Sequence, residues 1–354
     1  MRTSLFLLAG LVLVAACGDE TTEPTPVGDQ SATTASAVAH DSWLTLANMP
    51  ANRTNMAVAT VTNAAGQSVV YTIGGLTPTG MPSAKVTAYN VATNTWTFRR
   101  PLPVPLAGTS GAGVINGKIY VSGGYSGWAD NFPNNWLHMY DPATNTWSRK
   151  REIPSVKAGP EPWAESEYAF GNGVTGVIKG KLYVVSGCFV AWEPWGYFEE
   201  CDPLFFRYNP ATDRWVALPR PPFPGELTSG PSIGGVIGGK FYVMVQGRFA
   251  VYDPATNQWT TRTPLGLPRP GAASAVLGGK LYVMGGRRFK AAREAWETLD
   301  ITIVYDPATD AWTRRAPMPS PRTGIAASQV FLKGQPRIEV VGGVSPANNL
   351  QYVP

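Results

Sequence analysis

Histidine is almost missing from this sequence of 354 residues, where only His40 and His138 occur. That leaves too few imidazoles for a copper centre and no plausible histidine for a Ser-His-Asp triad. The sequence also lacks a CxxC pair and a glycine-rich phosphate loop that opens a helix. These absences argue against the common metal, redox and nucleotide chemistries, and we expect no metal site and no cofactor.

Long helical patterns are absent after the first twenty residues, which argues against a helical fold. The sequence has instead 38 Gly and 32 Pro for turns, and 12 Trp, 14 Tyr and 13 Phe for flat packing surfaces. Gly and Pro favour turns and aromatic residues favour strands, so the composition predicts an all-β protein.

The first residues have the pattern of a secretory signal. Arg2 precedes an apolar run at 5–14 that is too short to span a membrane as a mature helix. The residues at 14–17, VAAC, resemble the bacterial lipobox, which implies cleavage after residue 16 and acylation of Cys17. The alternative is an ordinary cleaved signal with an incidental cysteine. We expect a lipoprotein signal peptide at 1–16, and a chain exported and lipid-anchored in the bacterial cell envelope, on its periplasmic or surface side.

Residues 17–40 are polar, rich in Thr, Pro and Ala, and lack aromatic side chains. Such a segment buries too little apolar surface to fold, so the composition predicts a flexible tether behind the lipidated Cys17. The other two cysteines, Cys188 and Cys201, form an even pair in an exported chain. We expect a disulfide between them, with two free buried thiols as the alternative.

One eight-residue pattern, a Tyr followed by a turn and a Trp, occurs five times. The copies are YNVATNTW at 89–96, YDPATNTW at 140–147, YNPATDRW at 208–215, YDPATNQW at 252–259 and YDPATDAW at 305–312. Asp and Pro suit the opening of a tight turn, since Asp accepts backbone N–H bonds and Pro presets φ. The Tyr and the Trp should therefore lie on neighbouring antiparallel strands.

Each copy belongs to a longer unit of four short strands, whose second strand ends in a glycine pair or a degenerate version of one. These pairs stand at 74–75, 123–124, 186–187 (Ser-Gly), 246–247 (Gln-Gly), 285–286 and 342–343. Six units with this pair and with spaced Tyr and Trp resemble the kelch repeat over residues 41–354. The resemblance implies a six-bladed kelch β-propeller.

The sixth unit ends with Tyr352 and lacks the Trp of the other copies. The missing strand stands at the other end of the chain, around Trp43, which is followed by Met-Pro and Arg53 much as Trp312 is followed by Met-Pro and Arg322. We expect the N-terminal strand to complete the sixth blade, so that main-chain pairing closes the ring.

Strand parity places the Asp-Pro and Gly-Lys turns on one face, the bottom, and the irregular loops on the other, the top. The top loops differ most between units, with long insertions at 125–136, 188–203 and 287–300 and a Glu-rich entry at 152–171. Variable aromatic and charged loops on a rigid scaffold are where binding sites are built. The candidate ligand-binding residues are Trp128, Glu165, Trp192, Glu193 and Trp195, and the alternative for each Trp is loop packing.

Three arginines, Arg53, Arg269 and Arg322, follow a Met-Pro or Leu-Pro step before the first strand of their units. In kelch domains that bind acidic ligands, arginines at this position line the mouth of the central channel, and the resemblance implies that role here. The other units offer Leu106, the Glu-rich entry and Glu226 instead. The expected pocket is therefore two-sided, basic across blades one, five and six and acidic opposite. The alternative is that each Arg is tied to a neighbouring carbonyl or turn.

The net charge of +5 would suit nucleic acid, but export argues against that partner. We expect a monomeric binding module that recognises a protein or carbohydrate ligand on its top face and contacts the membrane through the lipid anchor only. An enzyme is the less favoured alternative. It would use a Glu beside an Arg to interconvert sugar anomers or epimers, similar to the sialic acid mutarotase, another six-bladed kelch protein of bacterial envelopes. A purely structural envelope module is a third possibility.

Overall fold

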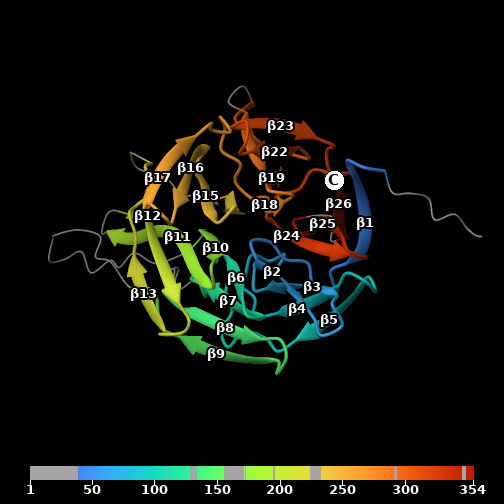
Figure 1. Cartoon of the computed structure of the whole chain (residues 1–354), viewed down its shortest axis with the longest axis horizontal. Coiled ribbons are helices and arrows are strands. Elements are labelled where there is room, and N and C mark those ends of the chain that lie inside the picture. Colours follow the sequence, from blue (N-terminus) through green and yellow to red (C-terminus); the bar gives the residue numbers. More distant parts are fainter. Residues whose placement is uncertain are drawn as a thin grey trace, which may run out of the picture. The chain divides into compact units, whose positions relative to one another are not determined.

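The computed structural model describes residues 39–109, 111–127, 134–154, 171, 173–193, 196–223, 233–290, 293–344 and 348–354, with the backbone alone at 187–193, 196–202 and 348. The elements in these ranges are β-strands, which form six four-stranded sheets and one two-stranded sheet with antiparallel pairing. Figure 1 shows the six larger sheets as blades around a common centre. The fold is the expected six-bladed β-propeller.

In the first three blades the chain runs outward from the innermost strand to the outermost. Blade 1 contains β2 (Ala57–Thr62), β3 (Ser68–Ile73), β4 (Val86–Asn90) and β5 (Thr95–Arg99). Blade 2 contains β6 (Ala112–Ile115), β7 (Lys118–Ser122), β8 (Leu137–Asp141) and β9 (Thr146–Lys150). Blade 3 contains β10 (Val174–Ile178), β11 (Lys181–Glu193), β12 (Gly196–Asn209) and β13 (Arg214–Ala217).

The last three blades include one insertion and one strand from the other end of the chain. Blade 4 contains β14 (Ile233–Ile237), β15 (Lys240–Val245), β16 (Arg248–Asp253) and β17 (Gln258–Arg262). Blade 5 contains β18 (Ala272–Leu277), β19 (Lys280–Gly285), β22 (Thr302–Asp306) and β23 (Ala311–Arg315), with the hairpin β20 (Arg287–Lys290) and β21 (Ala295–Thr298) inserted after β19. Blade 6 contains β24 (Ile325–Leu332), β25 (Gln335–Gly342), β26 (Asn348–Val353) and β1 (Ser42–Asn48).

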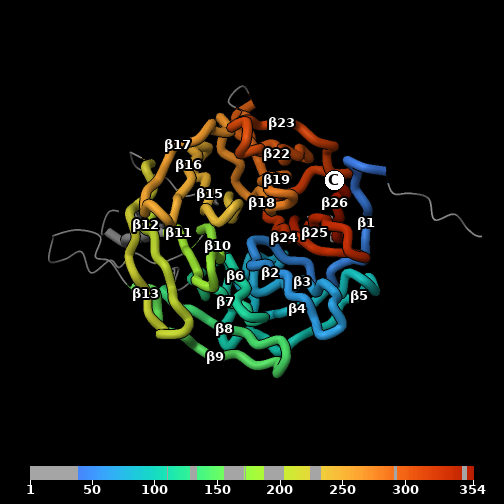
Figure 2. The backbone as a smooth tube through the Cα atoms, viewed as in Figure 1, coloured from blue at the N-terminus to red at the C-terminus, as the bar shows by residue number. Residues whose placement is uncertain are grey.

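The ring closes as the sequence predicts. Strand β1 pairs with β26 in antiparallel register, and Trp43 lies opposite Tyr352 with the ring centroids 5.2 Å apart. Figure 2 shows the blue N-terminal strand beside the red C-terminal one. The two ends of the chain therefore share one sheet, and blade 6 has no unpaired strand between them.

The innermost strands of neighbouring blades lie against one another, which explains their small residues. A Cβ atom on Gly113 of blade 2 would lie 2.4 Å from Leu182 Cδ1 of blade 3, and one on Gly176 would lie 2.7 Å from Val236 Cγ2 of blade 4. Neither distance leaves room for a methyl group, because the sheets are closely packed. Glycine at these positions lets the blades converge on the central axis.

The eight-residue repeat binds each blade to the blade before it. The Tyr hydroxyl donates to an Asn or Asp five residues later, for example Tyr140 to Asn145 Oδ1 at 2.6 Å. The same oxygen accepts the N–H of Arg100 from blade 1, at 2.9 Å, and the Trp147 indole donates to the Arg100 carbonyl at 3.0 Å. The Asn is in the left-handed region, with φ 54°. The repeat is therefore a junction between blades as well as a turn.

At the closing junction Asp41 supplies the oxygen that Asn145 supplies in blade 2. Its Oδ1 accepts the Tyr352 hydroxyl at 2.6 Å and the N–H of Ala316, the residue after β23, at 3.0 Å. The indole of Trp43 donates to the Ala316 carbonyl at 2.9 Å. The N-terminal segment thus completes the hydrogen-bond set of the repeat, together with the missing strand.

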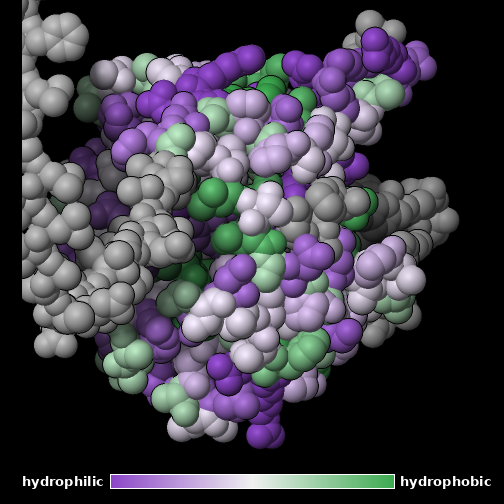
Figure 3. Space-filling view, turned by 90° about the vertical axis from the view of Figure 1, so that its right-hand side faces the viewer, coloured by the Kyte–Doolittle hydropathy of each residue, from purple (hydrophilic) through white to green (hydrophobic). Residues whose placement is uncertain are grey.

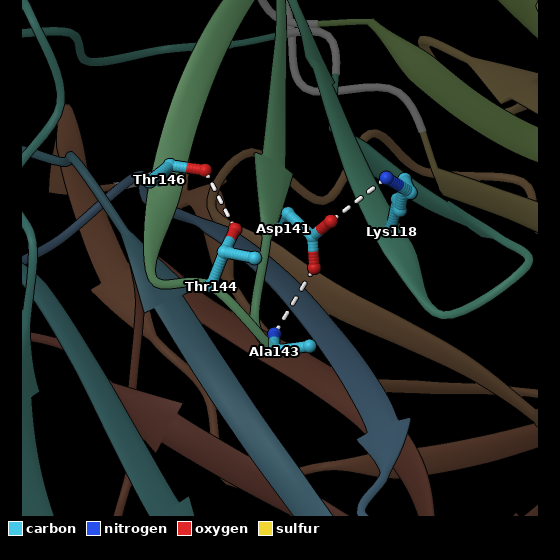
Figure 4. Close-up of polar contacts among 5 residues, drawn as sticks. All are labelled: Lys118, Asp141, Ala143, Thr144 and Thr146. Atoms are coloured by element: carbon cyan, nitrogen blue, oxygen red, sulfur yellow. Dashed lines mark hydrogen bonds and ion pairs between the residues drawn. The ribbon is translucent and has the colours of Figure 1, made fainter.

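The Asp-Pro and Gly-Lys turns lie on the same face, as strand parity predicts. In Figure 4, Asp141 accepts the N–H of Ala143 at 3.0 Å and pairs with Lys118 at 2.7 Å. The hydroxyls of Thr144 and Thr146 are 2.7 Å apart in the same turn. The Lys–Asp pair recurs as Lys240–Asp253 and Lys280–Asp306. The bottom face therefore carries one turn chemistry repeated around the ring.

Candidate functional site

The glycine pairs at 74–75, 123–124, 285–286 and 342–343 lie on the top face, which we define as residues 53–55, 74–84, 106–111, 123–127, 266–271, 285–298, 322–324 and 342–344 of the described chain. The second glycine of a pair donates its N–H to the residue that enters the next blade. The bonds are Gly75 to Leu106 O at 2.7 Å, Gly286 to Arg322 O at 2.8 Å and Gly343 to Arg53 O at 3.1 Å. The entry residues Leu106, Arg322 and Arg53 are therefore equivalent, and each lies at a blade junction.

Two positions after these entry residues, a chain of backbone hydrogen bonds runs from blade to blade. Gly324 donates to Gly271 O at 2.8 Å, Asn55 to Gly324 O at 3.0 Å, and Gly108 to Asn55 O at 3.1 Å. All four residues have positive φ, between 51° and 73°. Asn and Gly adopt this conformation at the lowest cost. This arc fixes the entry loops of blades 5, 6, 1 and 2 relative to one another, and no pattern in the sequence predicts it.

Arg53 is buried, with 2% of its surface exposed, and all five of its N–H donors have acceptors. These acceptors are Ala51 O at 3.3 Å, Gly74 O and Lys85 O at 2.6 Å, Thr72 Oγ1 at 2.9 Å and Thr87 Oγ1 at 3.1 Å. Burial lowers the pKa of Arg53 to about 10, so the guanidinium is charged at neutral pH. This geometry favours the second of the two alternatives for Arg53, a tie to neighbouring carbonyls, because no donor is left for a ligand.

The other two arginines differ in exposure. Arg322 is 1% exposed, and burial lowers its pKa. Arg269 is half-buried, and its guanidinium makes no hydrogen bond or ion pair within the described residues. Its pKa is lowered first by burial and then by repulsion from Arg288 and Arg314. Arg269 is therefore the one of the three whose donors remain available on the top face.

Arg269 also lies beside the blade 5 hairpin. The carbonyl of the next residue, Pro270, accepts the N–H of Arg287 at the start of β20, at 2.8 Å. The repulsion between Arg269 and Arg288 places a second cation of the hairpin near the same point. The positive side of the predicted pocket is thus concentrated at blade 5.

Several predicted site residues lie outside the described residues. These are Cys17, Trp128, Glu165, Trp195 and Glu226, so the acidic side of the pocket stays a prediction. Trp192 and Glu193 lie near the end of β11, where the backbone alone is described. The register of β11 and β12 places Cys188 directly opposite Cys201, at the base of this long hairpin.

The one buried histidine in the described chain does not form a catalytic site. His138 is 4% exposed, and its two ring nitrogens have no hydrogen-bond partner. Its ring meets Trp136 and Trp147 edge-on, with centroid distances of 5.9 and 6.3 Å. Burial, and then the charge of Arg149, lowers its pKa to about 4, so the imidazole is neutral and packs as an aromatic ring.

Neither a cluster of metal-ligating side chains nor a membrane-spanning helix is found in the described chain. Within the ranges given above, no three His, Cys, Asp or Glu side chains gather around a point that could hold a metal ion. In the same ranges, no helix is long and apolar enough to span a bilayer.

Comparison with known proteins supports a kelch-repeat family. The kelch motif model matches residues 108–152 and 268–319. Kelch-like protein terF of Aspergillus terreus is 28% identical over 318 residues, which are 85% of this chain and 64% of that protein. Kelch repeat and BTB domain-containing protein 12 of Homo sapiens is 29% identical over 192 residues, 49% of this chain and 29% of that protein. The chain thus spans less than two thirds of either relative.

A solved structure shares the fold. The structure of YjhT superposes with a TM-score of 0.65 over 86% of this chain and 95% of that chain, at 17% sequence identity. Similarity at this level of identity shows the six-bladed architecture and leaves the ligand to be argued from the residues of this chain.

Proposed function

We propose that this protein is a binding module of the cell envelope that recognises a protein or glycan ligand on the top face of its propeller. The kelch propeller fold suggests a protein-interaction module in general. One observation carries the choice of face: the Arg269 guanidinium on the top face has no hydrogen-bond partner among the described residues, whereas the bottom-face turns use their polar groups to bind one blade to another. A ligand on the bottom face would have to compete with those junctions.

The same proposal includes the anchoring of the chain. Residues 1–16 would act as the signal peptide, Cys17 would carry the lipid, and residues 17–40 would hold a monomeric propeller of residues 41–354 away from the membrane. We also propose the disulfide between Cys188 and Cys201. The opposed backbone positions of the two cysteines support it, since facing residues of an antiparallel pair have the Cα separation that a disulfide spans.

The experiment is a binding screen on the soluble domain, residues 39–354, against immobilised glycans, sugar acids and a peptide library. We expect Arg269→Ala to weaken binding of an acidic ligand about tenfold, because it removes a charged donor that has no partner among the described residues. Arg214→Ala is the matched control, since Arg214 is exposed beside a bottom-face turn. Equal losses in the two variants would contradict a top-face site, and the absence of any ligand would contradict the binding module itself.

A second candidate is an enzyme that interconverts sugar anomers or epimers, with Arg269 holding an anionic sugar. The structural similarity to YjhT is compatible with it. NMR exchange between the anomers of a sugar acid, accelerated by the wild-type domain and slower with Arg269→Ala, would favour the enzyme. An exchange rate that matches the buffer alone would leave the binding module.

A further inference from the structure

The long hairpin of blade 3 is a continuation of β11 and β12, whereas the hairpin of β20 and β21 is an insertion between the second and third strands of blade 5. It forms a separate two-stranded sheet outside the four strands of blade 5. In Figure 1 it stands at the rim of the ring, at the top of the view, and in Figure 3 it is the hydrophilic projection at the upper right. Blade 4 makes the same connection with the two residues Gln246 and Gly247, so the fold does not require the insertion.

The base of the hairpin is held by two blades. Within blade 5, Arg287 donates to Pro270 O at 2.8 Å and Leu299 donates to Gly286 O at 2.9 Å. From blade 6, Arg322 donates its backbone N–H to Leu299 O at 3.0 Å and accepts from Gly286. Leu299 is 5% exposed, which anchors the returning strand in the core. A ribbon fixed at its base loses little freedom when it binds a partner.

One face of the hairpin is charged and internally paired. Glu297 on β21 contacts Arg288 at 2.6 Å and Lys290 at 2.8 Å, both on β20. Hydrogen bonds first from Lys290 and then from Arg288 hold the pKa of Glu297 below its usual value. This face therefore satisfies its own charges and offers no unpaired group.

The opposite face is aromatic and carries an unpaired cation. Phe289 lies directly across from Trp296, with ring centroids 5.5 Å apart, and the two side chains are 51% and 53% exposed. The Arg287 guanidinium stands over the Trp296 ring, 5.4 Å from its centroid, and makes no ion pair within the described residues. Exposed Trp beside Arg, on a rigid element, has the composition of an interface hot spot.

Exposed apolar side chains gather on the same face of the propeller. Five of the eight large ones among the described residues lie in top-face segments: Met81, Leu267, Phe289, Trp296 and Val344. Because most of these exposed apolar side chains lie in top-face segments, and Phe289 and Trp296 contact one another, the top face is the surface that a partner would cover.

The charged side chains around the hairpin indicate that the partner is acidic. Residues 287–298 contain four basic and two acidic side chains, and Arg269 and Arg314 add two cations near its base. Within the described residues, Arg287 and Arg269 make no ion pair, and neither does Arg293 of the hairpin, so an acidic group that approaches the aromatic pair meets guanidinium groups without a carboxylate partner. An acidic partner also gains from long-range attraction to a chain of net charge +5.

We propose that the aromatic face of the β20–β21 hairpin, formed by Arg287, Phe289 and Trp296, docks a protein segment that carries an apolar side chain next to an acidic one. The apolar side chain covers the Phe289–Trp296 pair, and the carboxylate pairs with Arg287. This proposal rests on the proposed binding function and assigns it a surface and a partner chemistry.

The test selects a displayed library of random twelve-residue peptides on the folded domain and measures the affinity of the enriched peptides by titration calorimetry. We expect enrichment of an Asp or Glu within a few positions of an aromatic or large aliphatic residue. Trp296→Ala should weaken binding of these peptides about 30-fold and Arg287→Ala about fivefold. Lys290→Ala, on the paired face, is the matched control and should change the affinity less than twofold.

A second variant removes the hairpin as a whole, with residues 287–298 replaced by the Gln-Gly connection of blade 4. Its melting temperature shows whether the propeller still folds. Loss of binding by this folded variant supports the proposal. Enriched peptides that bind Trp296→Ala as tightly as wild type would overturn the hairpin and leave a top-face binding module standing. Binding of polygalacturonate or of phosphatidylglycerol vesicles through Trp296, with no enriched peptide, would replace the protein partner by a glycan or a membrane.

Discussion

At the scale of single residues, Glu339 is the exception in a repeated contact. In five blades the second strand carries a Tyr that packs against a Tyr of the next blade, with centroids 5.6 to 6.2 Å apart. In blade 6 that position is Glu339, which is fully buried and accepts hydrogen bonds from Asn349 and Gln351 at 2.9 and 3.0 Å. Burial raises its pKa to about 8, although Gln351, Asn349 and Arg337 oppose the rise. The groups that face it are Arg337 and, from blade 1, Tyr89.

Because of this carboxyl group, the free energy of unfolding decreases as the pH rises into the alkaline range. The folded state holds the proton more tightly than the unfolded chain, so its contribution is present below about pH 4.5 and is lost as the pH rises through 8. On this account the free energy of unfolding falls by roughly 4 kcal/mol between pH 5 and pH 9. Glu339→Gln should remove most of the slope, as measured by urea unfolding at the two pH values. Parallel curves for variant and wild type would show that Glu339 is ionised in the fold.

His138 has the opposite effect, because it decreases the free energy of unfolding as the pH falls into the acidic range. Its pKa is about 4 in the fold, so stability is complete above the unfolded value of about 6.5 and is lost as the pH falls through 4. The expected loss is roughly 3 kcal/mol at pH 4. Phe206 holds the equivalent position in blade 3 and meets Trp215 edge-on in the same way, with centroids 6.5 Å apart. His138→Phe should therefore keep the packing and unfold at a lower pH, and an unchanged acid midpoint would exclude His138 as the cause.

At the scale of elements, the short strand β1 makes contacts on which the stability of the whole ring depends. It supplies the outer strand of blade 6 and, through Asp41 and Trp43, the polar contacts to blade 5. Deletion of residues 41–47 from the 39–354 domain should lower the melting temperature by more than 10 °C, since it exposes the β26 edge and opens the ring. Asp41→Asn is the matched control, because Asn makes the same two contacts at position 145. A deletion variant that melts like wild type would refute closure by this strand.

At the scale of the whole molecule, the two faces of the propeller differ in how far the sequence predicts them. The blade count, the strand order and the closing pair of Trp43 and Tyr352 were predicted and are confirmed. They depend on local turn chemistry and on aromatic spacing, which recur in every unit and so are visible without coordinates. The top face has no such repetition, so the sequence named candidate residues in its loops but could not show which of their polar groups are available to a ligand.

The three arginines show why the candidate site could not be predicted from the sequence alone. Arg53, Arg269 and Arg322 look alike in sequence, each placed after a proline step before the first strand of a unit. Only the fold separates Arg53, four of whose five contacts go to carbonyls and threonines more than fifteen residues away, from Arg269, whose guanidinium has no hydrogen-bond partner among the described residues. The facing positions of Phe289 and Trp296 likewise depend on the register of β20 and β21.

The sequence by itself therefore determined the scaffold: six repeats, four strands in each, and a ring closed by its N-terminal strand. The repeats depend on contacts between residues close in the chain, and the closure between Trp43 and Tyr352 is visible because the sixth repeat lacks its Trp strand. The tertiary structure decided which polar groups the scaffold uses and which remain for a partner. Hydrogen bonds such as that between Arg53 and Thr87 join residues far apart in the chain, and their presence depends on how the entry segment of a blade packs against its strands.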